Sequence, residues 1–286
     1  MAERQLLEQA AERLLDPQAR AIASAVQWWE LPLPAGPWPV AVVGDGAPVL
    51  LLHGFDSSHL EFRRLAPLLA PHAQLFIPDL YGFGFCPRPA EGDYSPRGVL
   101  QHLEVLVDAV LERTGASSLG LIGASMGGSA AVELARRRAE QINRLLLLAP
   151  AGLTGKPMPV PPLLNQLGAR FLGLPAIRRG LCRSAFSQPD RDVGPAELEI
   201  ASVHLACPNW SGALAAFAGS GGFGGCGLPL PSQPLQVLYG ADDRILRGTP
   251  RREAQALLGE AIRELSDCGH LPHIDQPQSV AEVWLG

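Results

Sequence analysis

The stretch that decides the fold is Ser118-Leu-Gly-Leu-Ile-Gly-Ala-Ser-Met-Gly-Gly-Ser129. Its apolar start predicts a buried strand, and the helical pattern from Ser129 to Glu140 follows almost at once. Between them, Gly123 and Gly127 flank Ser125, and a side chain at either glycine would collide with the neighbouring strand or helix. The turn therefore predicts an exposed Ser125 hydroxyl at a helix N-terminus, where the helix dipole favours developing negative charge.

The Gly-x-Ser-x-Gly motif is weak evidence when it stands alone. The chain has 31 glycines among 286 residues, and composition alone gives such a motif about 0.2 times per chain. A packing turn of small residues is the alternative to a nucleophilic serine. Only catalytic partners of Ser125 elsewhere in the chain can distinguish a nucleophile from a packing turn.

The remaining apolar runs and helical spacings alternate along most of the chain. Strands without polar alternation, separated by helices, are typical of a mostly parallel sheet covered on both faces. We therefore predict an α/β fold. The predicted strands are 38–43, 48–52, 74–78, 142–148, 235–239 and 261–265, and the other predicted helices are 60–70, 96–113, 250–258 and one from 277 onward.

The alternation is interrupted at the start of the chain and after Gly152. An amphipathic pattern over 3–25 predicts a helix within an N-terminal unit, 1–30, that covers part of the main body. Residues 153–232 carry prolines, helical pieces and a glycine-rich end, and predict an inserted helical cap. The core is then formed by 31–152 and 233–286.

Composition excludes several classes of function. The net charge is −5 without a basic block, so we expect no nucleic-acid partner. No apolar run is long enough for an integral membrane segment. Five widely spaced cysteines without a C-x-x-C motif predict neither disulfides nor a metal site, and no cofactor motif is present. The first thirty residues lack a secretory signal, so we expect a cytoplasmic protein; oligomeric state is not indicated.

A serine nucleophile needs a base, and the base needs an acid that fixes its tautomer. In open α/β sheets such groups collect after the carboxyl ends of strands. His270 follows the final predicted strand and is the expected base, with His273 as the alternative. His59, His72 and His102 lie on predicted helices or loops and are expected to face solvent, and His204 is expected to pack within the cap.

Two neighbouring carboxylates are candidates for the acid. Asp242 and Asp243 both follow the strand that ends at Tyr239, one helix and one strand before His270. Asp79 also follows a strand but precedes the serine, and we interpret it as a residue that braces a loop. The residues leave the choice between Asp242 and Asp243 open.

An acyl-transfer serine also needs two donors that stabilise the oxyanion. The backbone N–H of Met126 follows the nucleophile directly, and the N–H of Phe55 is the expected second donor. Gly54 allows a close approach of that backbone, and His53 is expected to support the loop.

With these residues in place, the chain resembles the α/β-hydrolase superfamily, in its epoxide-hydrolase-like and C–C-hydrolase-like branch. The matching motifs extend from about residue 40 to the C-terminus apart from the cap: Leu51-Leu-His-Gly-Phe55, Pro78-Asp-Leu-Tyr-Gly-Phe-Gly84, Gly123-Ala-Ser-Met-Gly-Gly128, Leu148-Ala-Pro-Ala-Gly152, Gly240-Ala-Asp-Asp-Arg244 and Cys268-Gly-His270. In this branch the second Asp of a Gly-x-Asp-Asp-Arg run belongs to the triad, so the resemblance implies Asp243.

The resemblance implies a serine hydrolase with the catalytic residues Ser125, His270 and Asp243. A serine nucleophile differs from the aspartate of epoxide hydrolases and haloalkane dehalogenases. Apolar cap residues imply a small-molecule carboxylic ester with an apolar moiety, whereas a C–C hydrolase, an acyltransferase or a non-catalytic binding protein are the alternatives. We expect the cap arginines Arg178, Arg179 and Arg183 to form a face exposed to solvent. The alternative is that they bind a carboxylate of the substrate. The segment from His53 to Arg64 is similar to the same segment in a subgroup from photosynthetic organisms. This similarity adds a phytyl or other isoprenoid ester to the candidate substrates.

Overall fold

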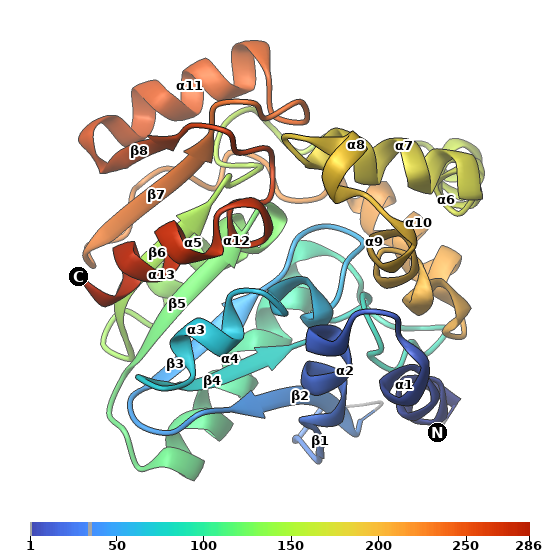
Figure 1. Cartoon of the computed structure of the whole chain (residues 1–286), viewed down its shortest axis with the longest axis horizontal. Helices are drawn as coiled ribbons and strands as arrows, with labels where there is room; N and C mark the ends of the chain where they lie inside the picture. The colour runs from blue at the N-terminus through green and yellow to red at the C-terminus, as the bar shows by residue number, and fades with distance from the viewer. Residues whose placement is uncertain (1, 34–35) are drawn as a thin grey trace.

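The computed structural model describes residues 2–33 and 36–286; all statements about structure refer to these ranges. They form one eight-stranded sheet in the order β1-β2-β4-β3-β5-β6-β7-β8 (Figure 1). Strands β3 to β8 are parallel, whereas β2 pairs antiparallel with both β1 and β4. The strands are β1 Val26–Trp29, β2 Trp38–Val43, β3 Pro48–Leu52, β4 Gln74–Pro78, β5 Leu119–Ala124, β6 Ile142–Leu148, β7 Leu235–Gly240 and β8 Ile262–Leu265. The α/β-hydrolase fold predicted from the sequence is confirmed.

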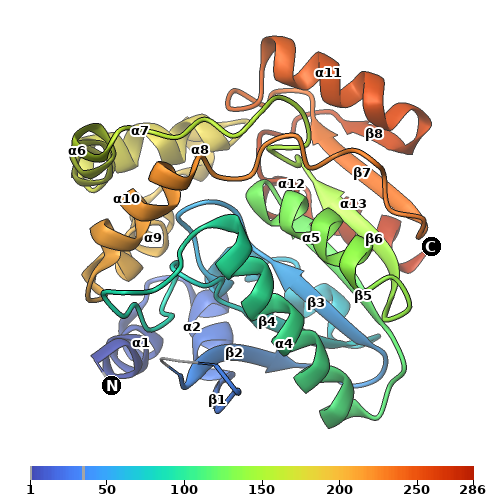
Figure 2. The ribbon, with the colours of Figure 1, turned by 180° about the vertical axis from the view of Figure 1, so that it is seen from behind.

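Helices cover both faces of the sheet, as the fully apolar strands require. Alternate residues of β3 point to opposite faces: Leu50 and Leu52 join one buried cluster, and Val49 and Leu51 join the other. Helices α4, α5 and α11 lie on one face and α3 and α13 on the other (Figures 1 and 2). Their bounds are α3 Ala66–Leu69, α4 Pro96–Thr114, α5 Met126–Arg137, α11 Gly248–Leu258 and α13 Pro277–Leu285.

The N-terminal segment differs from the single helix predicted over 3–25. It forms two helices, α1 Ala2–Arg13 and α2 Pro17–Ser24, followed by the unpredicted edge strand β1. Asp16 caps α2 by accepting hydrogen bonds from the backbone N–H groups of Gln18 and Ala19, and Pro17 opens the helix. An Asp-Pro pair is a local helix-start signal, and it divides one long amphipathic pattern into two.

Between β6 and β7 the described chain forms helices and no strand. These helices lie over the carboxyl ends of the parallel strands (Figure 1). They are α6 Pro162–Leu172, α7 Pro175–Ala185, α8 Pro189–Asp192, α9 Pro195–Ile200, the short 3-10 helix η2 Val203–Ala206, and α10 Trp210–Ser220. We keep the name cap for residues 153–232; its boundaries stay a prediction.

Three short helices remain in the described ranges. The predicted helix over 60–70 is shorter than expected and is split between the 3-10 helix η1 His59–Phe62 and α3. The 3-10 helix η3 Gly259–Ala261 and the short α12 Pro272–Asp275 complete the fold. No helix in the described ranges is both long enough and apolar enough to cross a membrane.

Candidate active site

Ser125 sits at the apex of the turn between β5 and α5. Its backbone has φ 49° and ψ −117°, a conformation that costs energy for a residue with a side chain. A Cβ on Gly123 would lie 2.5 Å from the carbonyl oxygen of Gly127, and one on Gly127 would lie 2.2 Å from that of Leu52. Only glycine fits both positions, so the close strand–helix approach holds Ser125 in its strained, outward geometry.

His270 joins Ser125 to Asp243. Its Nε2 lies 2.9 Å from the Ser125 Oγ, and its Nδ1 lies 2.9 Å from the Asp243 Oδ2. A carboxylate can only accept, so Nδ1 carries the proton and Nε2 is left to accept from the serine hydroxyl. The three residues that the sequence singled out are therefore brought into one hydrogen-bonded chain.

The surroundings of Asp243 keep it ionised. Burial by itself raises the pKa of this carboxyl, but the hydrogen bond and charge of His270 outweigh burial, so the pKa lies below its usual value. The backbone N–H groups of Ile245 and Leu246 also donate to its Oδ1, at 2.8 and 2.9 Å. Asp242 instead accepts a hydrogen bond from the Ser187 hydroxyl and does not contact His270.

The two expected oxyanion donors stand next to this chain. In the described part of the protein, the backbone N–H groups of Phe55 and Met126 donate to no other protein atom. His53 holds the loop that carries Phe55: its Nε2 accepts from the N–H of Leu80, and its Nδ1 lies 2.8 Å from the Gly54 carbonyl oxygen. Gly54 allows this loop to approach Ser125 closely, since a Cβ at position 54 would lie only 3.3 Å from the Ser125 Cβ.

The other histidines are more buried than the sequence indicated. His59 and His102 are buried, contrary to the expectation of solvent exposure, whereas His72 is exposed. The Nδ1 of His59 lies 2.8 Å from Asp79, which also accepts from the N–H of Phe85 and braces both loops as expected. His273, the alternative base, is buried 2.8 Å from Glu61 and is not part of the chain to Ser125.

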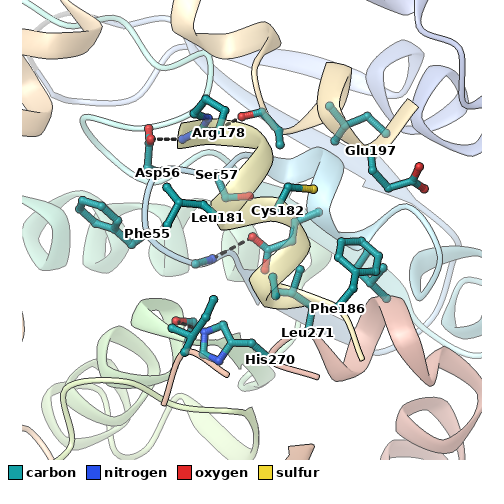
Figure 3. Close-up of a pocket in the computed structure, with 18 of the residues that line it drawn as sticks. Phe55, Asp56, Ser57, Arg178, Leu181, Cys182, Phe186, Glu197, His270 and Leu271 are labelled. Atoms are coloured by element: carbon teal, nitrogen blue, oxygen red, sulfur yellow. Dashed lines mark hydrogen bonds and ion pairs between the residues drawn. The ribbon is translucent and has the colours of Figure 1, made fainter. Parts of the chain in front are cut away.

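A cavity of about 280 Å³ opens above Ser125 and His270. Its apolar lining comes mainly from the cap and from the loop that contains His270, and includes Leu172, Leu181, Ala185, Phe186, Ile200, Leu271 and Ile274. Figure 3 shows His270 at one end of the cavity, the pair Asp56 and Arg178 at the other, and Leu181 and Cys182 between them. Burial raises the pKa of the Cys182 thiol to about 11, so it stays uncharged at neutral pH.

The far end of the cavity contains a buried ion pair that the sequence did not predict. Asp56 accepts from Arg178 of α7 at 2.5 Å and from the Trp210 indole of α10 at 2.8 Å, and lies 3.2 Å from His204 Nε2. Burial raises the pKa of Asp56, but the hydrogen bond and charge of His204 and the charge of Arg178 lower it below its usual value. Three cap elements therefore converge on the residue that follows Phe55.

This arrangement corrects the expectation of a solvated arginine face. Arg178 is buried, also donates to the Ala201 carbonyl oxygen, and faces the cavity. Arg179 is exposed, and Arg183 pairs with Asp190 near the surface. His204 packs within the cap as expected. The partners of Asp56 are more than a hundred residues away in sequence, so no local signal pointed to them.

The fold and the hydrogen-bonded serine, histidine and aspartate after strand ends define a protein of the α/β-hydrolase class. In line with this, residues 49–283 match the model of the alpha/beta hydrolase family. The match extends over most of the chain, and the protein belongs to this family. Within the described ranges, no group of three or more His, Cys, Asp or Glu side chains is arranged to hold a metal ion.

Individual relatives carry different activities in their names. The alpha/beta hydrolase domain-containing protein VTE7 of Arabidopsis thaliana is 26% identical over 97% of this chain and 88% of its own length. The 2-hydroxy-6-oxo-2,4-heptadienoate hydrolase of Pseudomonas putida is 26% identical over 82% of this chain and 86% of its own. Lipase 1 of Psychrobacter immobilis is 34% identical, over 40% of this chain and 35% of its own.

A solved structure of similar fold is the meta-cleavage product hydrolase of Pseudomonas fluorescens IP01. Its TM-score is 0.70, with 19% identity over 87% of this chain and 93% of that chain. The similarity concerns the fold. The family is thus established, while the relatives include both lipases and C–C bond hydrolases.

Proposed function

We propose that the protein is a serine hydrolase that cleaves a carboxylic ester with an apolar moiety through an acyl-enzyme. The observation that carries the proposal is the hydrogen-bonded chain from Ser125 through His270 to Asp243 at the base of the cavity. A serine so placed can lose its proton to Nε2 as it attacks, while ionised Asp243 stabilises the imidazolium that forms.

The steps follow from this geometry. Ser125 Oγ attacks the ester carbonyl carbon, its proton passes to His270 Nε2, and the N–H groups of Phe55 and Met126 stabilise the oxyanion. The C–O bond then breaks, and His270 returns the proton to the departing alcohol. Water attacks the acyl-enzyme with His270 as base, and releases the acid and free Ser125.

The charges of the cavity favour a neutral substrate. Its charged lining consists of three carboxylates and two guanidinium groups: Asp56, Glu61, Glu197, Arg63 and Arg178. The guanidinium groups are occupied, since Arg178 pairs with Asp56, and Arg63 lies 3.4 Å from Glu197 and 2.8 Å from Asp16. The rest of the lining is largely apolar, which suits an apolar acyl or alcohol part.

A C–C bond hydrolase is the second candidate. The 26% identity over 82% of the chain with the heptadienoate hydrolase of Pseudomonas putida supports it, and so does a guanidinium group facing the cavity. That substrate carries a carboxylate, however, and Arg178 would have to exchange its bond with Asp56 to bind it. An acyltransferase would use the same serine chemistry with an alcohol or amine in place of water.

Rates on two substrate sets separate these candidates. A panel of p-nitrophenyl esters of rising acyl length tests the ester hydrolase, and 2-hydroxy-6-oxo-2,4-heptadienoate tests C–C cleavage. We expect kcat/KM to rise with acyl length and the dienoate to remain uncleaved, with all ester activity lost in Ser125→Ala. Cleavage of the dienoate together with inert esters would overturn the proposal in favour of the second candidate.

A further inference from the structure

The outer flank of α6 is an apolar surface that faces solvent. Leu163, Leu164, Leu167 and Phe171 follow one another at helical spacing, and their exposed fractions range from 54 to 72%. The opposite flank, with buried Ala169, packs against α10. Figures 1 and 2 both place α6 and the neighbouring α7 at the outer edge of the molecule. Contiguous exposed apolar side chains of this kind mark an interaction site.

The same part of the cap is strongly basic in an acidic protein. Residues 153–189 contain one lysine, four arginines and no Asp or Glu, whereas the whole chain has a net charge of −5. Arg178 and Arg183 are paired with Asp56 and Asp190. Arg170 on α6 and Arg179 on α7 are exposed and form no ion pair or side-chain hydrogen bond with any described residue. Unpaired positive charge therefore borders the apolar flank.

The apolar flank leads directly to the cavity. Leu172, the last residue of α6, lines the cavity above Ser125. Leu181 of α7 also lines it and is still 42% exposed. An apolar substrate held in a lipid layer against α6 and α7 could thus enter the cavity without crossing bulk water.

We propose that α6 and α7 dock on an anionic lipid surface and present the cavity to it. Exposed apolar residues bordered by arginines are what an interfacial helix needs, because the apolar side chains insert while the cations meet lipid phosphates. A second copy of the chain fits this surface less well, because a symmetric dimer would bring together the same basic segment from both copies, and residues 153–189 offer no Asp or Glu to pair with Arg170 and Arg179. The delivery of substrate rests on the proposed function, whereas the docking does not.

Co-sedimentation of the Ser125→Ala protein with vesicles tests the docking without turnover. We expect binding to phosphatidylcholine vesicles that contain phosphatidylglycerol, and much weaker binding to phosphatidylcholine alone. Added salt should weaken the binding because it screens the charges. The triple variant Leu163→Ser, Leu167→Ser and Phe171→Ser should bind about 100-fold more weakly, because each half-inserted side chain contributes a factor of about five.

Two further variants separate charge from apolar contact. Arg170→Gln with Arg179→Gln should lower the affinity for anionic vesicles by about 20-fold and leave binding to neutral vesicles unchanged. Leu285→Ser is the matched control: Leu285 is 45% exposed and is the last residue of α13, a helix on the opposite side of the molecule from α6 (Figure 1), so its loss should change nothing. None of these residues lines the cavity.

The outcomes distinguish this proposal from the proposed function. Equal vesicle binding by the Ser125→Ala protein and the triple variant would overturn the docking, even if the protein hydrolyses soluble esters. Concentration-dependent dimerisation that the triple variant abolishes, without vesicle binding, would overturn it in favour of a second copy. Vesicle binding that the variants weaken as expected supports the docking, even if every ester is inert and the proposed function fails.

Discussion

Removal of the Asp56 carboxylate is predicted to loosen the cap and the oxyanion loop together. Asp56 follows Phe55 in the loop after β3, with a φ of 50°. Its side-chain partners Arg178, His204 and Trp210 all belong to the cap. In Asp56→Ala the His204 ring and the Trp210 indole lose this partner, and Arg178 keeps only the Ala201 carbonyl oxygen as acceptor. The guanidinium group of Arg178 is then left buried without its counter-charge.

The expected loss of stability follows from that burial. Removing one member of a buried ion pair typically costs about 3–5 kcal/mol, a large part of the roughly 5–15 kcal/mol that stabilises a domain. The pKa of Asp56 is lowered in the folded state, so its contribution is present above the unfolded pKa and is lost as pH falls through the folded value. The difference between variant and wild type should therefore be full at neutral pH and shrink in strong acid.

Urea unfolding followed by tryptophan fluorescence measures this loss, and ester kinetics measure its effect on the site. We expect kcat to fall by up to about 100-fold, with a smaller change in KM, because the N–H of Phe55 is displaced. In Asp56→Leu with Arg178→Met, apolar groups replace the ion pair, and part of the stability should return. A free energy of unfolding within about 1 kcal/mol of wild type for Asp56→Ala would refute the reasoning. Additive effects of Asp56→Leu and Arg178→Met in a double-mutant cycle would refute it as well.

Three further changes test other parts of the account. Asp243→Asn should lower kcat by about 10⁴-fold because His270 loses its tautomer, whereas Asp242→Asn should stay within a few-fold, as measured on the same ester. Burial lowers the pKa of His102 to about 3, so between pH 6.5 and about 3 the unfolded state binds a proton there that the folded state does not. The free energy of unfolding should therefore fall by up to about 1.4 kcal/mol for each pH unit of acidification in this window. His102→Phe should flatten that slope in urea titrations. Gly127→Ala should greatly reduce kcat or prevent folding, since its Cβ would meet the Leu52 carbonyl oxygen, and near-wild-type activity would contradict the close packing of the turn.

The parts of the fold that the sequence predicted carry local signals. The strands were apolar runs bounded by turn residues, and Ser125, Asp243 and His270 each followed one of them. Because the carboxyl ends of parallel strands meet at one edge of the sheet, residues after separate strands could be expected to converge. The break between the two N-terminal helices also has a local signal, the Asp16-Pro17 helix start, although the amphipathic pattern continues across it.

The rest depended on contacts between distant residues. His102 is buried because it packs against Trp38, with ring centroids 4.2 Å apart, and its own helix does not reveal this contact. Arg178 is buried where it pairs with Asp56, which lies 122 residues away in the sequence. A polar residue on a predicted helix is exposed by default, and only the tertiary structure shows which ones are paired.

Covalent labelling of Ser125 tests the central claim most directly. A fluorophosphonate probe reacts with a serine only when that serine is activated, and intact-protein mass spectrometry counts the adducts. We predict one adduct on the folded wild-type protein, mapped to Ser125, and none on Ser125→Ala or on protein denatured beforehand. An unlabelled folded protein, or equal labelling of wild type and Ser125→Ala, would contradict the nucleophile.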